Sequence, residues 1–253
     1  TLAVQKEREI DMTTIIREEL NVGDVCFDLG SNIGFYPMLD SLCVAPSGKI
    51  VCVEPDPRNI PILEKNIGLF ENSDMAVMLN VAISSSSEKK YLKQTEHTNL
   101  NILYNAPLDD GDHTIVECLT VDDLVVKTGL KPDFIRMDIE GHEVSAFAGM
   151  KNLIKSNKPM KIFFELHPNL YNQENSLVEQ LDILFKNGFS SKYVISSGKE
   201  IPVEFAARGY VPSRIFQSDG FNRGEFQNVM NDDAIYFATA MPKLARYIFL
   251  ERK

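Results

Sequence analysis

Short apolar runs, each followed at once by an acidic or turn-forming residue, recur along the chain. The run at 25–27 (VCF) precedes Asp28, and the run at 49–53 (KIVCV) precedes Glu54. Runs of this length, bounded by turn residues, are typical of buried strands in a parallel sheet. The same pattern predicts further strands at 76–84, 134–139, 161–166, 193–196 and 234–239.

Apolar residues recur at helical spacing between these runs. Helices are predicted over 4–20 and from 34 to about 43, and Asp11 is the cap of the first. A third helix is predicted after Glu54 with Asn59 as its cap, and a fourth runs from Thr120 to Gly129. Three more are predicted over 144–154, over 177–185 and in the tail from 243. Alternating strands and helices predict an α/β fold with a doubly wound, Rossmann-like sheet, whose ligands gather where the strands end.

We expect a single domain over 1–253 with three additions to this sheet. They are an N-terminal helix (1–20), an inserted β-hairpin region (89–118) and an irregular segment (199–231) that would cover the substrate. The last segment carries five aromatic residues that either cover an apolar substrate or anchor a loop. These residues are Phe205, Tyr210, Phe216, Phe221 and Phe226.

Charge and cysteine content exclude several classes of function. The net charge is −10 and no basic run occurs, which argues against nucleic acid as a partner. No apolar stretch is long enough for a membrane span, so we expect no membrane partner and a cytoplasmic protein. The four cysteines form no CxxC pair, so neither a disulfide framework nor a zinc site is expected. The oligomeric state is not predicted.

The loop after the first strand has the pattern D-x-G-x-N-x-G. An acid stands where a dinucleotide-binding loop has its first glycine. An acid there repels phosphate but suits a cationic ligand such as S-adenosylmethionine, which we predict as the cofactor. The predicted cofactor contacts in this loop are Asp28, Gly30, Ser31, Asn32 and Gly34.

An acid at the end of the second strand completes the predicted nucleoside site. Glu54 would accept hydrogen bonds from both ribose hydroxyls, although it could also cap the helix that follows. Asn80 and Ala82, near the end of the third strand, are predicted to flank the adenine.

Charged residues interrupt the two following strands. Arg136 and Glu165 lie in otherwise apolar runs and would form an ion pair if these strands are neighbours. Alternation places Asp138 on the same strand face as Arg136, nearer the reacting groups and the cofactor. These three residues are candidate catalytic residues, and the other reading is a purely structural ion pair.

A family resemblance rests on six motifs that occur in order: DLGSNIG, VEPDPRN, NVAIS, LTVDDL, FIRMDIEGHE and FFELHP. Together they resemble the FkbM family of S-adenosylmethionine-dependent methyltransferases. The resemblance implies a seven-stranded methyltransferase sheet and methyl transfer to oxygen of sugars, polyketides or similar metabolites. The family often has lysine at the position of Arg136, and an arginine there cannot accept a proton.

Methyl transfer to a hydroxyl requires a base, because the hydroxyl loses its proton as it attacks. His142 is the first candidate and His167 the second, since each follows the end of a central strand. Asp138, Glu140, Glu165 and His167 could instead ligate a divalent ion, but their spacing is scattered and we expect no metal. The partner is therefore expected to be a small molecule with a hydroxyl group.

Two other functions compete with an O-methyltransferase. One is a nicotinamide-dependent oxidoreductase, which the missing first glycine disfavours. The other is a nucleoside-binding module without catalysis, which only a test of methyl transfer would exclude.

Overall fold

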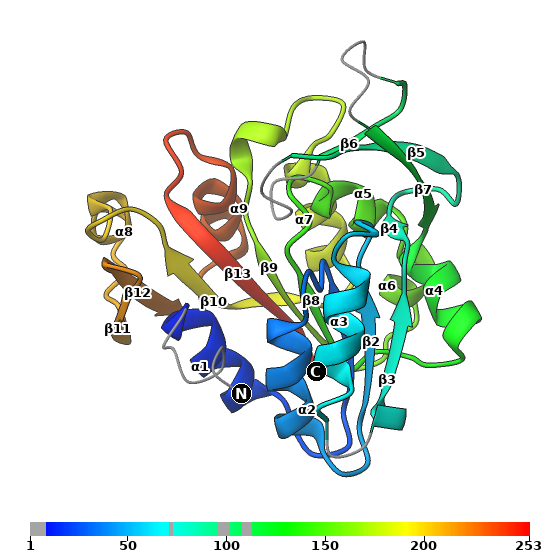
Figure 1. The fold of residues 1–253 in the computed structure, drawn as a ribbon. Helices are drawn as coiled ribbons and strands as arrows, with labels where there is room; N and C mark the ends of the chain where they lie inside the picture. The colour runs from blue at the N-terminus through cyan, green and yellow to red at the C-terminus, as the bar shows by residue number, and fades with distance from the viewer. Residues whose placement is uncertain (1–8, 71–72, 96–101, 108–112) are drawn as a thin grey trace. The chain divides into compact units, whose positions relative to one another are not determined.

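The computed structural model describes residues 9–70, 73–95, 102–107 and 113–253 (Figure 1). The chain forms two compact units. One comprises Leu20–Leu153 and is called the 20–153 unit. The other joins Thr1–Glu19 to Ile154–Lys253 and is called the C-terminal unit.

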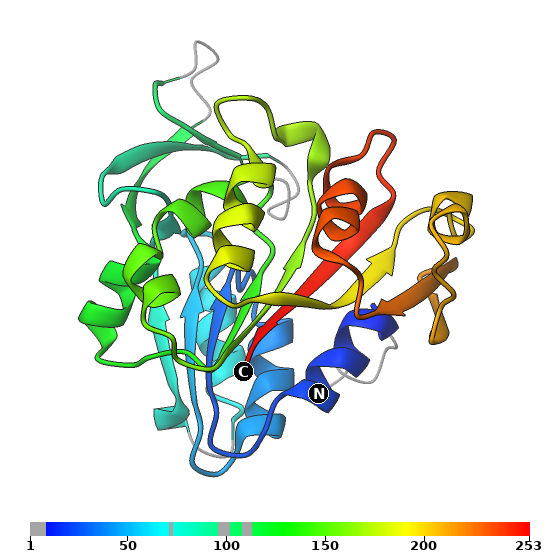
Figure 2. The ribbon, with the colours of Figure 1, turned by 180° about the vertical axis from the view of Figure 1, so that it is seen from behind.

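The 20–153 unit is built on a parallel sheet with the strand order β8-β1-β2-β3. Its strands are β1 (Val25–Leu29), β2 (Lys49–Val53), β3 (Ala76–Leu79) and β8 (Phe134–Met137). Helices α2 (Phe35–Val44) and α3 (Ile60–Ile67) lie in front of this sheet in Figure 1, and α4 (Val121–Thr128) and α5 (Glu143–Ala148) lie on its opposite face in Figure 2. Covering both faces buries β1, β2 and β8 almost completely, which explains their apolar runs. The predicted α/β, doubly wound architecture is confirmed.

A second sheet in this unit has the order β4-β7-β5-β6. Its strands are β4 (Ala82–Ile83), β5 (Lys89–Lys93), β6 (Ile102–Tyr104) and β7 (His113–Leu119). Strand β5 pairs antiparallel with both β6 and β7, which agrees with the hairpins predicted at 89–118, although 96–101 and 108–112 lie outside the described residues. The small sheet lies beyond the ends at which the parallel strands finish (Figure 1).

One predicted strand in this unit is wrong, because 76–84 forms two strands in different sheets. The chain turns at Asn80, whose side-chain amide donates to the carbonyl oxygens of Glu54 (2.8 Å) and Pro55 (3.1 Å). The helix predicted over 144–154 also divides, into α5 and α6 (Lys151–Lys155), at Gly149. A Cβ on Gly149 would lie 2.5 Å from the Ser84 carbonyl oxygen, so this crossing needs glycine.

The described residues of the C-terminal unit form strands in the order β11-β12-β10-β13-β9, each antiparallel to its neighbours. They are β9 (Met160–Glu165), β10 (Ser190–Ser196), β11 (Arg214–Ser218), β12 (Phe221–Gln227) and β13 (Ala245–Arg252). Its helices are α1 (Ile10–Glu19), α7 (Leu177–Lys186), α8 (Val203–Ala207) and α9 (Asn231–Thr239). Short 3-10 turns are η1 (Ser73–Met75) in the 20–153 unit and η3 (Pro168–Leu170) in this one.

The end of the chain differs from its prediction. The run at 234–239 is helix α9 and the tail is strand β13, so the two predicted types are exchanged. Five consecutive apolar residues carry no period, whereas Asp232 and Asp233 in the first turn favour a helix. Strand β13 lies between β10 and β9 and is buried on both faces, so it lacks the alternation of an exposed strand.

The segment 199–231 is regular, because it contains α8, β11 and β12. Phe205 is fully buried and stacks between Phe226 and Phe237, with ring centroids 4.0 Å apart in each pair. These rings therefore anchor the segment in the core. That the segment also covers a substrate stays a prediction.

Helix α1 begins later than the predicted helix over 4–20, of which 4–8 lie outside the described residues. Asp11 does not cap it. The Asp11 side chain is buried within the first turn and forms an ion pair with Arg223 (2.8 Å). Among the helices of the described residues, none has the length and apolar character needed to cross a membrane.

Candidate functional site

The loop between β1 and α2 approaches the end of β8 closely. Gly30 has a φ of 88°, and a Cβ there would lie 2.1 Å from the Asp138 carbonyl oxygen. Asn32 (φ 49°) and Gly34 (φ 93°) also adopt left-handed conformations. Only glycine fits at position 30, which accounts for the glycine that the loop pattern predicts.

The Glu54 carboxylate, 5% exposed, ties this loop to the end of β2. Its Oε2 accepts the Asn32 backbone N–H (2.8 Å), and its Oε1 accepts the Asp56 backbone N–H (2.8 Å) and the Asn59 side-chain amide (3.1 Å). Burial raises the pKa of Glu54 to about 7, although these hydrogen bonds favour the charged form. A carboxylate oxygen can accept two hydrogen bonds, so Oε2 keeps capacity for a ligand hydroxyl.

Arg136 lies between two carboxylates at the ends of β1 and β8. Its Nη1 donates to Asp28 (2.9 Å) and to the Gly30 carbonyl oxygen (3.2 Å), and its Nη2 donates to Asp138 (3.0 Å). The guanidinium also stacks on Tyr36, 3.7 Å from the ring centroid. Burial alone would lower the pKa of Arg136, but the two carboxylates outweigh it and raise that pKa. Arg136 therefore stays charged.

The predicted ion pair between Arg136 and Glu165 is wrong. Parallel pairing of β1 and β8 places Arg136 directly opposite Asp28, which gives it a nearer acid. Glu165 instead lies beside Lys243 (3.5 Å) and Arg246 (3.6 Å) of its own unit.

Asp28 has no exposed surface, so a bound ligand would meet the loop above it and not its carboxylate. The cation that this acid holds is the Arg136 guanidinium. Beneath it, Asp40 is also fully buried and accepts a hydrogen bond from the Cys26 thiol (3.2 Å). Burial and the charge of Asp28 raise the pKa of Asp40 well above its usual range.

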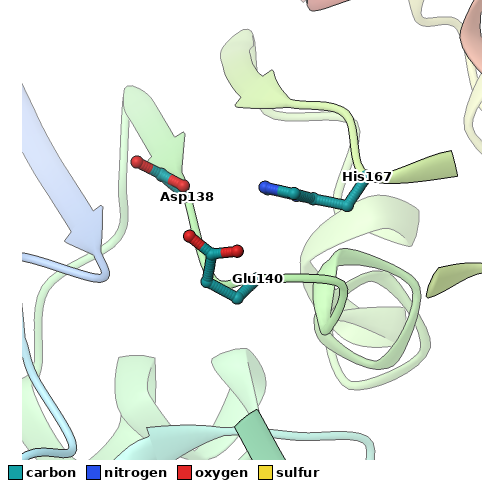
Figure 3. A group of neighbouring side chains, drawn as sticks. All are labelled: Asp138, Glu140 and His167. Atoms are coloured by element: carbon teal, nitrogen blue, oxygen red, sulfur yellow. The ribbon is translucent and has the colours of Figure 1, made fainter. Parts of the chain in front are cut away.

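A tight turn follows β8 and brings two acids together. Glu140 (φ 51°) and Gly141 (φ 90°) make the turn, and the buried Glu143 carboxylate accepts the backbone N–H groups of Ile139 (3.3 Å) and Gly141 (3.4 Å). Carboxylate oxygens of Asp138 and Glu140 lie within 4.8 Å of each other. Figure 3 shows the two side chains next to each other. Both side chains are partly exposed.

His142 ends this turn and begins α5. Its imidazole forms a hydrogen bond with the backbone of Leu103 in β6. Burial lowers the pKa of His142, Glu143 partly opposes that shift, and the charge of Lys90 lowers the pKa further. The ring is therefore neutral at pH 7. His167, also labelled in Figure 3, belongs to the C-terminal unit, where its backbone N–H donates to the Tyr171 hydroxyl (2.9 Å) at the start of η3.

The remaining predicted cofactor residues differ in exposure. Asn80 is exposed just after β3, and Ser31 is buried with its hydroxyl donating to the Asp28 carbonyl oxygen (3.0 Å). Ala82 packs in the apolar core of the small sheet, so an adenine could reach only its backbone.

Sequence reasoning missed several residues of this site. Tyr36 and Asp40 lie on α2, directly after the loop. A polar residue on the buried face of a predicted helix could have indicated that Asp40 belongs to the site. Lys90 gave no signal, because a lysine in a predicted hairpin is expected to be exposed.

Comparisons with known proteins identify relatives of the chain. Residues 28–193 match the family described as "Methyltransferase FkbM domain". The chain is 27% identical over 160 residues to the hexuronic acid methyltransferase AglP of Haloferax volcanii, and the match covers 58% of this chain and 59% of that protein. The chain thus matches less than two thirds of this curated relative.

Two solved structures are also similar. Methyltransferase FkbM from Methylobacillus flagellatus KT has a TM-score of 0.41 and 19% identity, covering 56% of this chain and 32% of its own. An O-methyltransferase from Bacillus cereus, in complex with SAH, has a TM-score of 0.46 and 10% identity, covering 96% and 79%.

The raised pKa of Glu54 predicts a stability that depends on pH. Its folded pKa of about 7 exceeds the usual 4.5, so its contribution to stability is present below 4.5 and is lost as the pH rises through 7. Glu54→Gln removes this titration. The free energy of unfolding of the wild type, relative to the variant, should therefore fall by about 3 kcal/mol between acidic and mildly alkaline pH.

Urea unfolding of both proteins across this pH range measures the difference. Glu64→Gln, on the exposed face of α3, is the matched control and should show a difference that does not vary with pH. A Glu54→Gln difference that is also independent of pH would contradict a buried, protonated Glu54.

Proposed function

The chain belongs to the FkbM family of methyltransferases, and on this premise we propose that it transfers a methyl group from S-adenosylmethionine to a hydroxyl group of a sugar. The observation that carries this proposal is the geometry of the 20–153 unit. There the glycine loop, the Glu54 carboxylate and the acids after β8 lie where the parallel strands end. The named activity of the relative AglP supports a sugar as the acceptor.

The residues of this edge fit the cofactor. The backbone at 30–34 forms a close cradle that a side chain at Gly30 would obstruct, and Glu54 Oε2 has capacity for a ribose hydroxyl. Asp138, whose side chain is 29% exposed, offers negative charge to a cationic ligand. When bound, S-adenosylmethionine supplies an electrophilic methyl group.

His142 is the proposed base. A backbone carbonyl oxygen can only accept, so the imidazole donates its N–H to Leu103. This hydrogen bond fixes the tautomer and leaves the other ring nitrogen as a proton acceptor. Because the ring is neutral at pH 7, it can take the proton that the acceptor hydroxyl loses as it attacks. Arg136 keeps a positioning role, since it holds Asp138 and the loop in place.

The competing functions have less support. A dinucleotide needs a donor-rich loop for its pyrophosphate, and here the position of the first glycine is a buried acid. A binding module without catalysis needs no neutral histidine between β8 and α5.

Labelled cofactor tests the proposed function directly. The protein, incubated with S-adenosylmethionine carrying an isotopic methyl group and a panel of sugar glycosides, should yield an O-methylated glycoside identified by mass spectrometry. Cofactor binding measured by calorimetry without transfer to any acceptor would favour the binding module. Binding of NADH with no binding of S-adenosylmethionine would favour the oxidoreductase.

Removal of the proposed base should lower turnover. His142→Gln keeps the size and hydrogen-bonding ability of the side chain but cannot accept a proton, so kcat should fall by about 10²–10⁴-fold with little change in cofactor affinity. His113→Gln, on β7, is the matched control and should retain activity. Equal kcat values for the two variants would remove His142 from the mechanism.

A further inference from the structure

Asp56 is a buried acid in the turn that follows Glu54. Its side chain has no exposed surface, whereas that of Arg58 is 41% exposed. The Asp56 Oδ1 accepts the backbone N–H (2.9 Å) and the Nε–H (3.0 Å) of Arg58, and its Oδ2 accepts the Nε–H (3.0 Å) and an Nη2–H (2.6 Å). A guanidinium that meets both oxygens of a carboxylate is held in one orientation. Arg58 and Asp56 therefore form a fixed unit within this turn.

The end of β5 joins the same ion pair. The Gln94 side-chain amide donates to Asp56 Oδ1 (3.3 Å), and Arg58 Nη1 donates to the Thr95 carbonyl oxygen (3.1 Å). An ordinary surface ion pair contributes little, because both of its members are solvated and mobile. This pair differs, since its acid is fully buried and its guanidinium contacts two segments of the chain. The turn after β2 is therefore fastened to the small sheet.

This turn also presents donors to the Glu54 carboxylate. The Asp56 backbone N–H (2.8 Å) and the Asn59 side-chain amide (3.1 Å) both donate to Glu54 Oε1. The Asn59 backbone N–H donates to the Asp56 carbonyl oxygen (3.0 Å), so the two donors belong to one hydrogen-bonded turn. Glu54 Oε1 thus has two protein donors, while Oε2 has the Asn32 backbone N–H and capacity for a ligand. The turn sets which oxygen of Glu54 is offered to a ligand.

The charges of the turn act on Glu54 as well. Burial raises the pKa of Glu54, and the negative charge of Asp56 adds to this rise, while the hydrogen bonds from the turn oppose it. The Arg58 guanidinium counters the charge of Asp56, so its removal would increase the repulsion between the two acids. A ribose hydroxyl donates more strongly to an ionised carboxylate than to a protonated one. Arg58 therefore favours the form of Glu54 that suits a ribose.

We infer that Arg58 is a positioning residue for the cofactor. Through Asp56 it holds the Glu54 carboxylate in the orientation and charge that bind the ribose hydroxyls, and so gives the site its preference for a ribonucleoside over a 2′-deoxyribonucleoside. The inference rests on the proposed function and names how that function selects its cofactor. Arg58 acts through the turn and needs no contact with the cofactor itself.

Two ligands that differ in one ribose hydroxyl test this inference. They are S-adenosylhomocysteine and its 2′-deoxy analogue, and calorimetry at about pH 8 gives the dissociation constant of each. The wild type should bind the ribose form about 10- to 100-fold more tightly, because the analogue lacks a hydrogen bond to a charged acceptor. Arg58→Met should lower this preference by about tenfold. Lys65→Met removes an exposed cation from α3 and should keep the wild-type preference.

A double variant shows whether the effect passes through Glu54. Glu54→Gln should bind the two ligands with nearly equal affinity, and adding Arg58→Met to Glu54→Gln should leave that ratio unchanged. Arg58→Lys keeps the charge but not the two-pronged contact, so it should retain part of the preference. Thermal unfolding checks that each variant is folded. If Arg58→Met does not fold, Arg58→Gln takes its place, because its amide can still donate to Asp56 without a positive charge.

The outcomes separate this inference from the proposed function. A wild-type preference in Arg58→Met, or an equal weakening of both ligands, overturns the role of Arg58 and leaves the cofactor site intact. Loss of the preference supports that role even if no acceptor is methylated, since the ratio is measured without turnover. A wild-type protein that binds neither ligand overturns both the inference and the proposed function.

Discussion

The pairing of Arg136 with Asp28 and Asp138 is the interaction on which the rest of the site depends. One guanidinium joins the ends of β1 and β8 and also donates to the Gly30 carbonyl oxygen, so it fixes both strands and the loop between β1 and α2. A buried pair of this kind contributes little net stability, but leaving Asp28 buried without its partner would cost several kcal/mol. The loop conformation therefore depends on an ion pair in which removal of either charge would leave the other buried without its partner.

The acidic residues near one edge of the sheet have different roles because they differ in burial. Asp28 and Asp40 are fully buried and do not reach a ligand, so their effect is on the position of the loop and of α2. Glu54 is held by three protein donors, yet burial keeps its pKa near 7, so donors from a ligand would favour its charged form. Asp138 and Glu140 keep exposed surface and are the acids that a ligand can meet.

The sequence predicted the parallel half of the fold well, because its signals are local. The run at 25–27 predicts a strand and the glycines after it predict a loop. Thr120 predicts the start of a helix, and its side chain accepts the Asp123 backbone N–H. The exchange of helix and strand at α9 and β13 had another origin: a short apolar run has no period, and its type is decided by the neighbours against which it packs.

The partners of the charged residues were also beyond sequence reasoning. The true partner of Arg136 depends on the register between β1 and β8, which no local pattern reports. Lys90 is similar, because its burial follows from the face of the small sheet on which β5 places it. Such residues are identified only when strands far apart in the sequence are seen together.

We propose that the ends of β1, β2 and β8 hold the methyl donor. A crystal structure with S-adenosylhomocysteine tests it most directly. We expect the ribose hydroxyls to bind the Glu54 carboxylate, the loop backbone at 30–34 to contact the ligand, and the ion pairs of Arg136 to stay intact. A ligand bound away from Glu54, or one whose entry separates Arg136 from Asp28, would contradict it.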